Sequence, residues 1–348
     1  MKRFAASILL STCLAAAPAD AAGTWVEMYG GDQLIREQPR FEQFIDKLYA
    51  FLRDTIVQSG IAGDSRAVAA VRIKLPLPDG PASPLNFYSS PSGPTVFLPL
   101  FSLLFLEELT TAYAWLYSQN YSLETIDEYL AMLHFKPAAA FPGGRYPPPL
   151  AALGVPAEAW KEPAVGELGL RFRNSAVAFI LAHELGHIAL HHQGYSGISR
   201  EVSRRDESGA DAFALAVMAR TATIPMGAVL FFQAQAYTMP SFGLYKSQGR
   251  SVEDWDKAMR DEITHPLTPD RLSAIAVSLS RQAVKESRPA ERETLGFIAT
   301  RLAKIAEDLG DVDLQQCVAV AAARADPAEL RPHRAGLTEQ FLSKCVRR

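Results

Sequence analysis

The spacing of apolar and polar positions along the chain predicts a mostly helical protein with a small sheet in its N-terminal third. Apolar residues recur at helical spacing in residues 41–58, 100–117, 123–135, 172–192, 207–219, 225–237, 251–262 and from 272 to the C-terminus. Short apolar runs bounded by Pro or Gly predict strands at residues 67–75, 85–89 and 95–98. The expected fold class is therefore α+β, mostly helical.

A proline-rich segment, residues 137–163, interrupts the helical pattern. It contains seven prolines and the pair Gly143-Gly144, so a long regular helix or strand is excluded there. Irregular segments of this length inside a domain are usually functional or disordered. We expect an insertion that is either a surface excursion or a lid over an active site.

The first 22 residues have the layout of a secretory signal peptide. A short basic start is followed by an apolar run over residues 4–17 and by the small-x-small site Ala19-Asp20-Ala21. The alternatives are an ordinary N-terminal helix and lipoprotein processing at Cys13. We expect a periplasmic or secreted protein, with peripheral association with the cell envelope as a further possibility and lipid anchoring at Cys13 as the second choice.

The charge, hydropathy and cysteine content of the chain indicate which classes of partner and which disulfides to expect. The formal net charge is −3 among 348 residues, which gives no indication of nucleic-acid binding. No later apolar run is long enough for a membrane span. Once Cys13 is removed with the signal, Cys317 and Cys345 remain, and in an oxidising compartment they are expected to form one disulfide. Two unpaired buried thiols are the alternative.

The strongest chemical signal is the motif His183-Glu184-Leu185-Gly186-His187. Histidines at i and i+4 lie one turn apart on one helix face, so both imidazoles can bind one metal ion. Glu184 borders that face and can act on metal-bound water as a base. The surrounding residues are apolar, and ionisable groups in such a helix are costly unless they are paired or bind metal. The motif predicts one Zn²⁺, with a helix carrying surface histidines as the alternative.

A catalytic zinc usually needs a third protein ligand and an open position. Glu207 is the best candidate, because it shares a helix face with Asp211 and the preceding residues can turn the chain back over the motif helix. Asp211 would hold the second nitrogen of a ligating histidine. A charged first helical turn is the alternative, and Asp206 and Glu201 are the other possible ligands.

His191 and His192 follow the motif closely but are poor ligand candidates. His191 lies about 12 Å along the helix axis from His183, whereas ligand atoms lie about 2 Å from a zinc ion. Both are expected to face solvent or to line the edge of the cleft.

These residues resemble the gluzincin metallopeptidases. The pairing of His183-Glu184-x-x-His187 with Glu207 and Asp211 is similar to the HtpX/Oma-like family, which includes the CAAX prenyl proteases, and the run through His191 is similar to the ImmA/IrrE-type peptidases, the second choice. Further segments that fit the first family are Asn86, Thr95-Val96-Phe97 and Thr264-His265-Pro266-Leu267-Thr268-Pro269-Asp270-Arg271-Leu272.

The resemblance implies a zincin-like metallopeptidase domain over residues 23–280, which includes the insertion, followed by a helical C-terminal region over residues 281–348. It also implies that the late segment lies near the active site. His265 there would stabilise the oxyanion, and Arg271 would pair with an acidic group.

The expected function is that of a zinc metalloendopeptidase that acts on envelope or misfolded proteins. Zinc-bound water would be the nucleophile and Glu184 the general base. A peptide substrate could add as a strand to the edge near residues 85–98. The alternative is an extracytoplasmic zinc-binding chaperone or assembly factor with little turnover. Further alternatives are a structural metal site with no open position and a hydrolase that acts on something other than peptides.

Overall fold

The computed structural model describes residues 26–348 apart from 62, 78–83, 91–92, 194–197, 239–244, 246–248, 256, 258–266, 335–342 and 347–348. The predicted signal peptide, Cys13 and His265 lie outside the described residues, as does part of the helix predicted at 251–262. The predicted α+β, mostly helical class is confirmed.

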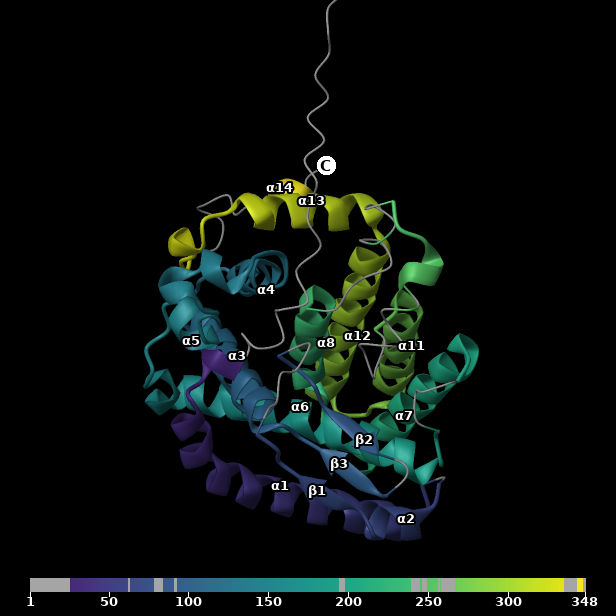
Figure 1. Ribbon diagram of the computed structural model, residues 1–348. Coiled ribbons are helices and arrows are strands. Elements are labelled where there is room, and N and C mark those ends of the chain that lie inside the picture. Colours follow the sequence, from purple (N-terminus) through teal and green to yellow (C-terminus); the bar gives the residue numbers. More distant parts are fainter. Residues whose placement is uncertain are drawn as a thin grey trace, which may run out of the picture.

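Helix α6 (Pro163–Ala189) is the central element of the fold (Figure 1). Helices α3 (Leu100–Ser118), α7 (Arg200–Arg220) and α8 (Met226–Thr238) pack around it. Every residue from 175 to 189 is buried, because the helix is apolar on all sides and an all-apolar helix is stable only inside the protein.

The remaining helices pack on α6 or on the helices around it. They are α1 (Gly31–Ser59), α2 (Ser65–Ala69), α4 (Glu124–Phe135), α5 (Pro149–Ala152), α11 (Pro269–Lys285), α12 (Pro289–Gly310), α13 (Val312–Arg324), α14 (Ser343–Val346) and the 3-10 turns Val26–Met28, Ala138–Ala140, Pro142–Gly144, Ala159–Lys161 and Pro327–Glu329. Helices α1, α6 and α7 begin earlier than predicted. In α1 the helix continues through Pro39, and α6 begins at Pro163, which suits the first helical position.

A three-stranded sheet lies between α1 and α6 in Figure 1. Strands β1 (Arg72–Lys74), β2 (Tyr88–Ser90) and β3 (Thr95–Phe97) have the order β1-β3-β2, with β1 parallel and β2 antiparallel to β3. The prediction of a strand over residues 67–75 was wrong for its first half. Asp64 caps α2 by accepting hydrogen bonds from the backbone N–H groups of Arg66 (2.9 Å) and Ala67 (3.1 Å), and such a cap starts a helix.

The proline-rich segment packs against the outer side of α3. The Tyr129 hydroxyl donates to the carbonyl of Pro147 (2.9 Å), and the backbone N–H of Leu150 donates to Glu108 (3.3 Å). Gly166 of α6 lies so close to the carbonyl of Trp160 that a Cβ would approach it to 2.4 Å. Neither these contacts nor the segment's short helices reach the pocket described below, which favours a packed surface excursion.

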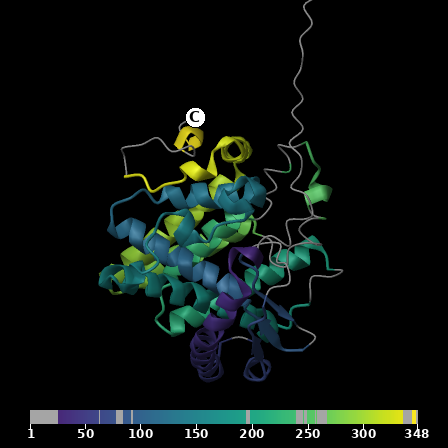
Figure 2. The same cartoon turned by 60° about the vertical axis from the view of Figure 1, so that its left-hand side comes forward.

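The C-terminal helices cover the end of the molecule opposite α1 (Figure 2). Helices α11 and α12 pack side by side, and α11 runs through residue 280, so the domain division placed there stays a prediction. Cys317 and Cys345 lie at disulfide distance, with an S–S separation of 2.14 Å, in agreement with the predicted bridge. Within the described ranges, no helix is both long and apolar enough to cross a membrane.

Candidate metal centre

Close approach of α6 and α7 creates the candidate site. A Cβ on Gly186 would lie 3.1 Å from both the Cα of Ala210 and the Cβ of Phe213, so a residue without a side chain lets the two helices touch. Ser199 starts α7 by accepting a hydrogen bond from the Val202 N–H (3.3 Å). The contact brings the first half of α7 over the histidines of α6.

Three buried side chains converge at this contact. The Nε2 atoms of His183 and His187 lie 3.0 Å apart. Glu207 places Oε2 3.5 Å from the Nε2 of His183 and Oε1 3.4 Å from the Nε2 of His187. All three residues are at most 6% exposed, and they form a cluster that could hold a metal ion.

Two residues behind the cluster orient it. Asp211 places Oδ1 2.8 Å from the Nδ1 of His183, the carboxylate–histidine arrangement that fixes the ring of a metal ligand. Arg271, in the first turn of α11, donates to Asp211 from Nε (2.7 Å) and Nη2 (2.9 Å). Its Nη1 lies 2.7 Å from Oε2 of Glu207, so one guanidinium holds the carboxylates of Glu207 and Asp211.

The pKa values of His183 and Asp211 are shifted by the charged side chains packed around them. Burial opposes the charged form of His183, but Asp211 and Glu207 outweigh burial and raise the pKa of His183 to about 9. Burial likewise opposes the charged form of Asp211, yet Arg271 and His183 lower its pKa below the usual value. Glu184, Glu207 and Asp211 are three carboxyl groups beside one guanidinium, that of Arg271, so acidic side chains outnumber arginine in and around the cluster.

Of the two positions predicted for His191 and His192, in solvent or at the edge of the cleft, His191 takes the first, whereas His192 lies against the cluster. The side chain of His191 is 69% exposed and lies 3.4 Å from Asp64. The side chain of His192 is only 12% exposed, and its Nδ1 lies 2.9 Å from the Nδ1 of His187. Burial, followed by the charge of His187, lowers the pKa of His192 to about 4, so its ring is neutral near pH 7.

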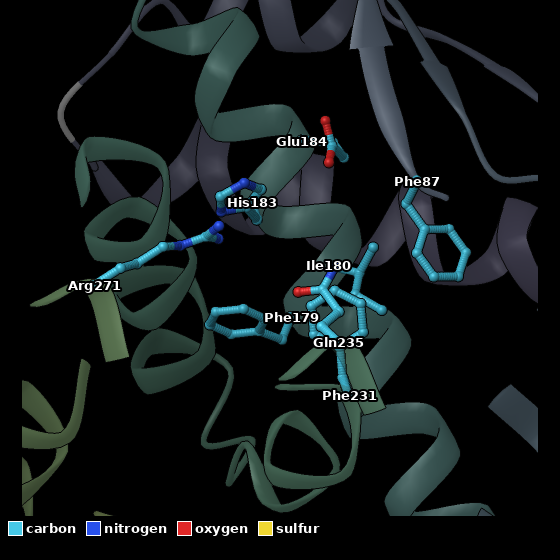
Figure 3. A pocket seen from close by; sticks show the side chains of 8 residues that line it. All are labelled: Phe87, Phe179, Ile180, His183, Glu184, Phe231, Gln235 and Arg271. Atoms are coloured by element: carbon cyan, nitrogen blue, oxygen red, sulfur yellow. The ribbon is translucent and has the colours of Figure 1, made fainter. Parts of the chain in front are cut away.

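A small pocket opens beside His183 and Glu184 (Figure 3). Its remaining lining residues are Phe87, Phe179, Ile180, Phe231, Gln235 and Arg271. In Figure 3 Arg271 approaches from the side of His183, and Phe87 faces the pocket from the opposite side. The pocket is thus apolar except for Gln235 and for the end where the motif residues and Arg271 lie.

The structure brings together six of the seven residues predicted for the site, and His265 is the one outside the described part of the chain. The sequence analysis missed Phe87, Phe231 and Gln235 as pocket residues and His192 as a partner of His187. Gln235 had a detectable signal, since it is one of two glutamines in a mostly apolar helix, with Gln233, and is only 4% exposed. No pattern in the chain pointed to the other three.

A comparison with known families gives one match, which covers the same part of the chain. The model of the Peptidase U49 family matches residues 171–288, a segment that contains the motif of α6, Glu207 and Asp211 of α7, and Arg271. No curated protein and no solved structure matches the chain significantly. The match does not support the HtpX/Oma-like or the ImmA/IrrE-type assignment. A segment similar to a peptidase family that also carries a cluster able to hold a metal indicates a peptidase.

Proposed function

We propose that this chain is a zinc-dependent metalloendopeptidase that cleaves proteins of the cell envelope or misfolded proteins after export. The observation that carries the proposal is the convergence of His183, His187 and Glu207 inside the segment similar to Peptidase U49. The signal-like residues 1–22 are the basis for export. The HtpX/Oma-like resemblance remains an expectation about the subfamily.

The geometry of the three side chains fits zinc. Ligand atoms about 2 Å from a tetrahedral zinc lie about 3.3 Å from one another. The two Nε2 atoms lie 3.0 Å apart, and each lies 3.4 or 3.5 Å from the nearer oxygen of Glu207. Two histidines and one glutamate are a ligand set used by catalytic zinc sites, which keep one position open. When bound, the ion would activate water and polarise the scissile carbonyl.

Glu184 is the general base of the proposed reaction. It lines the pocket next to His183 and does not belong to the His183–His187–Glu207 cluster, so its role in the proposed reaction is that of a base and not of a metal ligand. It accepts a proton from the attacking water and delivers it to the leaving amine. Arg271 and Asp211 keep Glu207 and His183 in place while the proton moves.

The apolar wall beside the motif favours an apolar side chain in the substrate. Phe87, Ile180 and Phe231 form this wall, and an apolar side chain packed against it is removed from water. Phe87 leads directly into β2 (Tyr88–Ser90), an outer strand of the sheet. A substrate side chain on this wall would have its backbone near β2, which agrees with the strand addition expected from the sequence.

Replacement of Glu184 tests the mechanism. We expect Glu184→Gln to bind zinc as the wild type does and to lose casein-degrading activity by a factor on the order of 10²–10⁴. The matched control is Glu167→Gln on the same helix, because the side chain of Glu167 is 66% exposed and pairs only with Arg171 among the described residues. Activity that survives in Glu184→Gln contradicts the mechanism. A zinc-loaded wild type without chelator-sensitive activity supports the chaperone alternative.

A further inference from the structure

The two histidines of the cluster are supported by different partners. His183 has a carboxylate behind it, Oδ1 of Asp211 at 2.8 Å. His187 has instead the Nδ1 of His192 at 2.9 Å, and the two rings are nearly perpendicular, with an interplanar angle of 74°. A metal-ligating histidine usually donates its second N–H to a carboxylate, a carbonyl or water, so a second imidazole in this place calls for a reason.

The end of α6 dictates the position of His192. His191 has a φ of 52°, a left-handed conformation that histidine adopts more readily than most residues other than glycine. The N–H of His192 donates to the carbonyl of His187 (2.9 Å), and the N–H of His191 donates to that of Ile188 (3.2 Å). These two bonds form a Schellman motif, which returns the chain over the last turn and places His192 against His187.

Helix α7 leaves room for the ring. A Cβ on Gly209 would lie 3.3 Å from Cε1 and 3.4 Å from Nε2 of His192, so a larger residue would crowd the imidazole. Asp206 is 5% exposed, and its Oδ1 lies 3.9 Å from the Nε2 of His192. The same helix that supplies Glu207 therefore supplies both the space for His192 and a carboxylate on its far side.

Hydrogen-bond chemistry fixes the direction of the contact. A neutral imidazole has one N–H donor and one acceptor nitrogen. His187 needs its Nε2 lone pair for a metal, so its proton is on Nδ1 and is donated to the Nδ1 of His192. The proton of His192 is then on Nε2, on the side of Asp206. Asp206 lies 3.9 Å from that nitrogen, beyond hydrogen-bond distance, so the contact that matches the one from His183 to Asp211 is the one from His187 to His192.

We propose that His192 is a positioning residue of the metal centre, which orients His187 and fixes its tautomer so that Nε2 faces the ion. The proposal rests on the zinc site of the proposed function but not on its peptidase activity. A merely space-filling His192 is the competing explanation, and it predicts that any ring of similar size suffices.

Zinc affinity of the purified chain, measured by competition with a chromophoric chelator, distinguishes these explanations. We expect His192→Phe, which keeps a ring but loses the acceptor, to weaken zinc binding by about 10- to 100-fold. His192→Asn places an acceptor oxygen where Nδ1 was and should recover most of the affinity. The matched control is His191→Asn, since asparagine tolerates the left-handed conformation and the exposed His191 ring should not affect binding.

The Co²⁺-substituted chain gives a second readout that packing alone would not change. We expect the visible absorption bands of bound Co²⁺ to change in His192→Phe and to stay as in the wild type in His191→Asn. If His192→Phe does not fold, His192→Ala serves in its place against the same control. If His192→Phe binds zinc with wild-type affinity and gives the wild-type Co²⁺ spectrum, the proposal is overturned. A wild-type chain that binds zinc but cleaves nothing overturns the proposed function alone, and a chain that binds no divalent ion overturns both.

Discussion

The two halves of α6 hold charged side chains in different ways. In the N-terminal half, Arg173 pairs with Glu107 of α3 at 2.5 Å, and Arg40 of α1 binds the same carboxylate through two hydrogen bonds of 2.8 Å. In the C-terminal half, the cluster around His183 and His187 combines three carboxylates with one guanidinium, from Arg271. Negative charge is thus matched at one end and in excess at the other.

This difference indicates that the charged side chains have a packing role at the N-terminal end of α6 and a chemical role at its C-terminal end. Burial alone raises the pKa of Glu107, but the two arginines lower it below its usual value, so this carboxylate is already satisfied and joins α1, α3 and α6. At the other end the excess charge raises the pKa of His183 to about 9. A buried site that attracts a proton so strongly is suited to a divalent cation.

Removal of one arginine at each end of α6 should give the largest difference in stability between the two groups of charged side chains. We expect Arg271→Met to lower the free energy of unfolding of the metal-free chain by about 3–5 kcal/mol, because it leaves two buried carboxylates without their cation. Arg173→Met should cost only about 1 kcal/mol, since Glu107 is partly exposed and keeps Arg40. Urea unfolding in the presence of a chelator measures both variants, and equal losses would contradict the distinction.

The pH dependence of Glu108 sharpens the comparison at the matched end. Burial raises the pKa of this carboxyl from 4.5 to about 7. The folded state therefore binds more protons than the unfolded state between these values, and the contribution to stability falls as pH rises through the window. We expect Glu108→Gln to equal the wild type near pH 4 and to exceed its stability by ~2 kcal/mol above pH 7.

The neighbouring Glu107 provides the control with the opposite sign. Its lowered pKa means that its stabilisation is present above pH 4.5 and is lost as the pH falls through the folded value. The deficit of Glu107→Gln relative to the wild type should therefore shrink in acid. Parallel pH profiles of the two variants in thermal unfolding would show that the two carboxyls do not differ as described.

Glycines at the two ends of α6 give the smallest expected effect. Gly186→Ala places its Cβ 3.1 Å from the Cα of Ala210, whereas at Gly169 the nearest atom, the Cα of Thr111, is 3.5 Å away. Gly169→Ala should be neutral or stabilising by about 0.5–1 kcal/mol. Gly186→Ala should cost about 1 kcal/mol and weaken zinc binding, because α7 and Glu207 move outward. Unchanged zinc affinity in Gly186→Ala would count against the role of the helix contact.

Local patterns in the sequence were sufficient for much of the fold and for the centre of the site. Helical spacing identified the apolar helices, and the separation of His183 from His187 by one turn identified two histidines on one face. Glu207 was found because its helix follows the motif closely and must pack nearby. The strand expected at residues 67–75 failed in its first half because the cap supplied by Asp64 was overlooked.

The parts of the site that escaped prediction depend on tertiary contacts or on an unusual backbone. His192 turns inward only because His191, which is not a glycine, adopts a left-handed conformation. No pattern in a single sequence predicts that conformation. Phe87 and Phe231 meet in the pocket with ring centroids 6.2 Å apart, although they are far apart along the chain. Contacts of this kind follow from packing and leave no periodic signal.

The most direct test of the account is the location of bound zinc in crystals of the purified chain, from anomalous diffraction at the zinc absorption edge. The account predicts one anomalous peak, about 2 Å from the Nε2 atoms of His183 and His187 and from a carboxylate oxygen of Glu207. A zinc ion bound elsewhere, or crystals soaked in zinc that show no peak between these side chains, would contradict it.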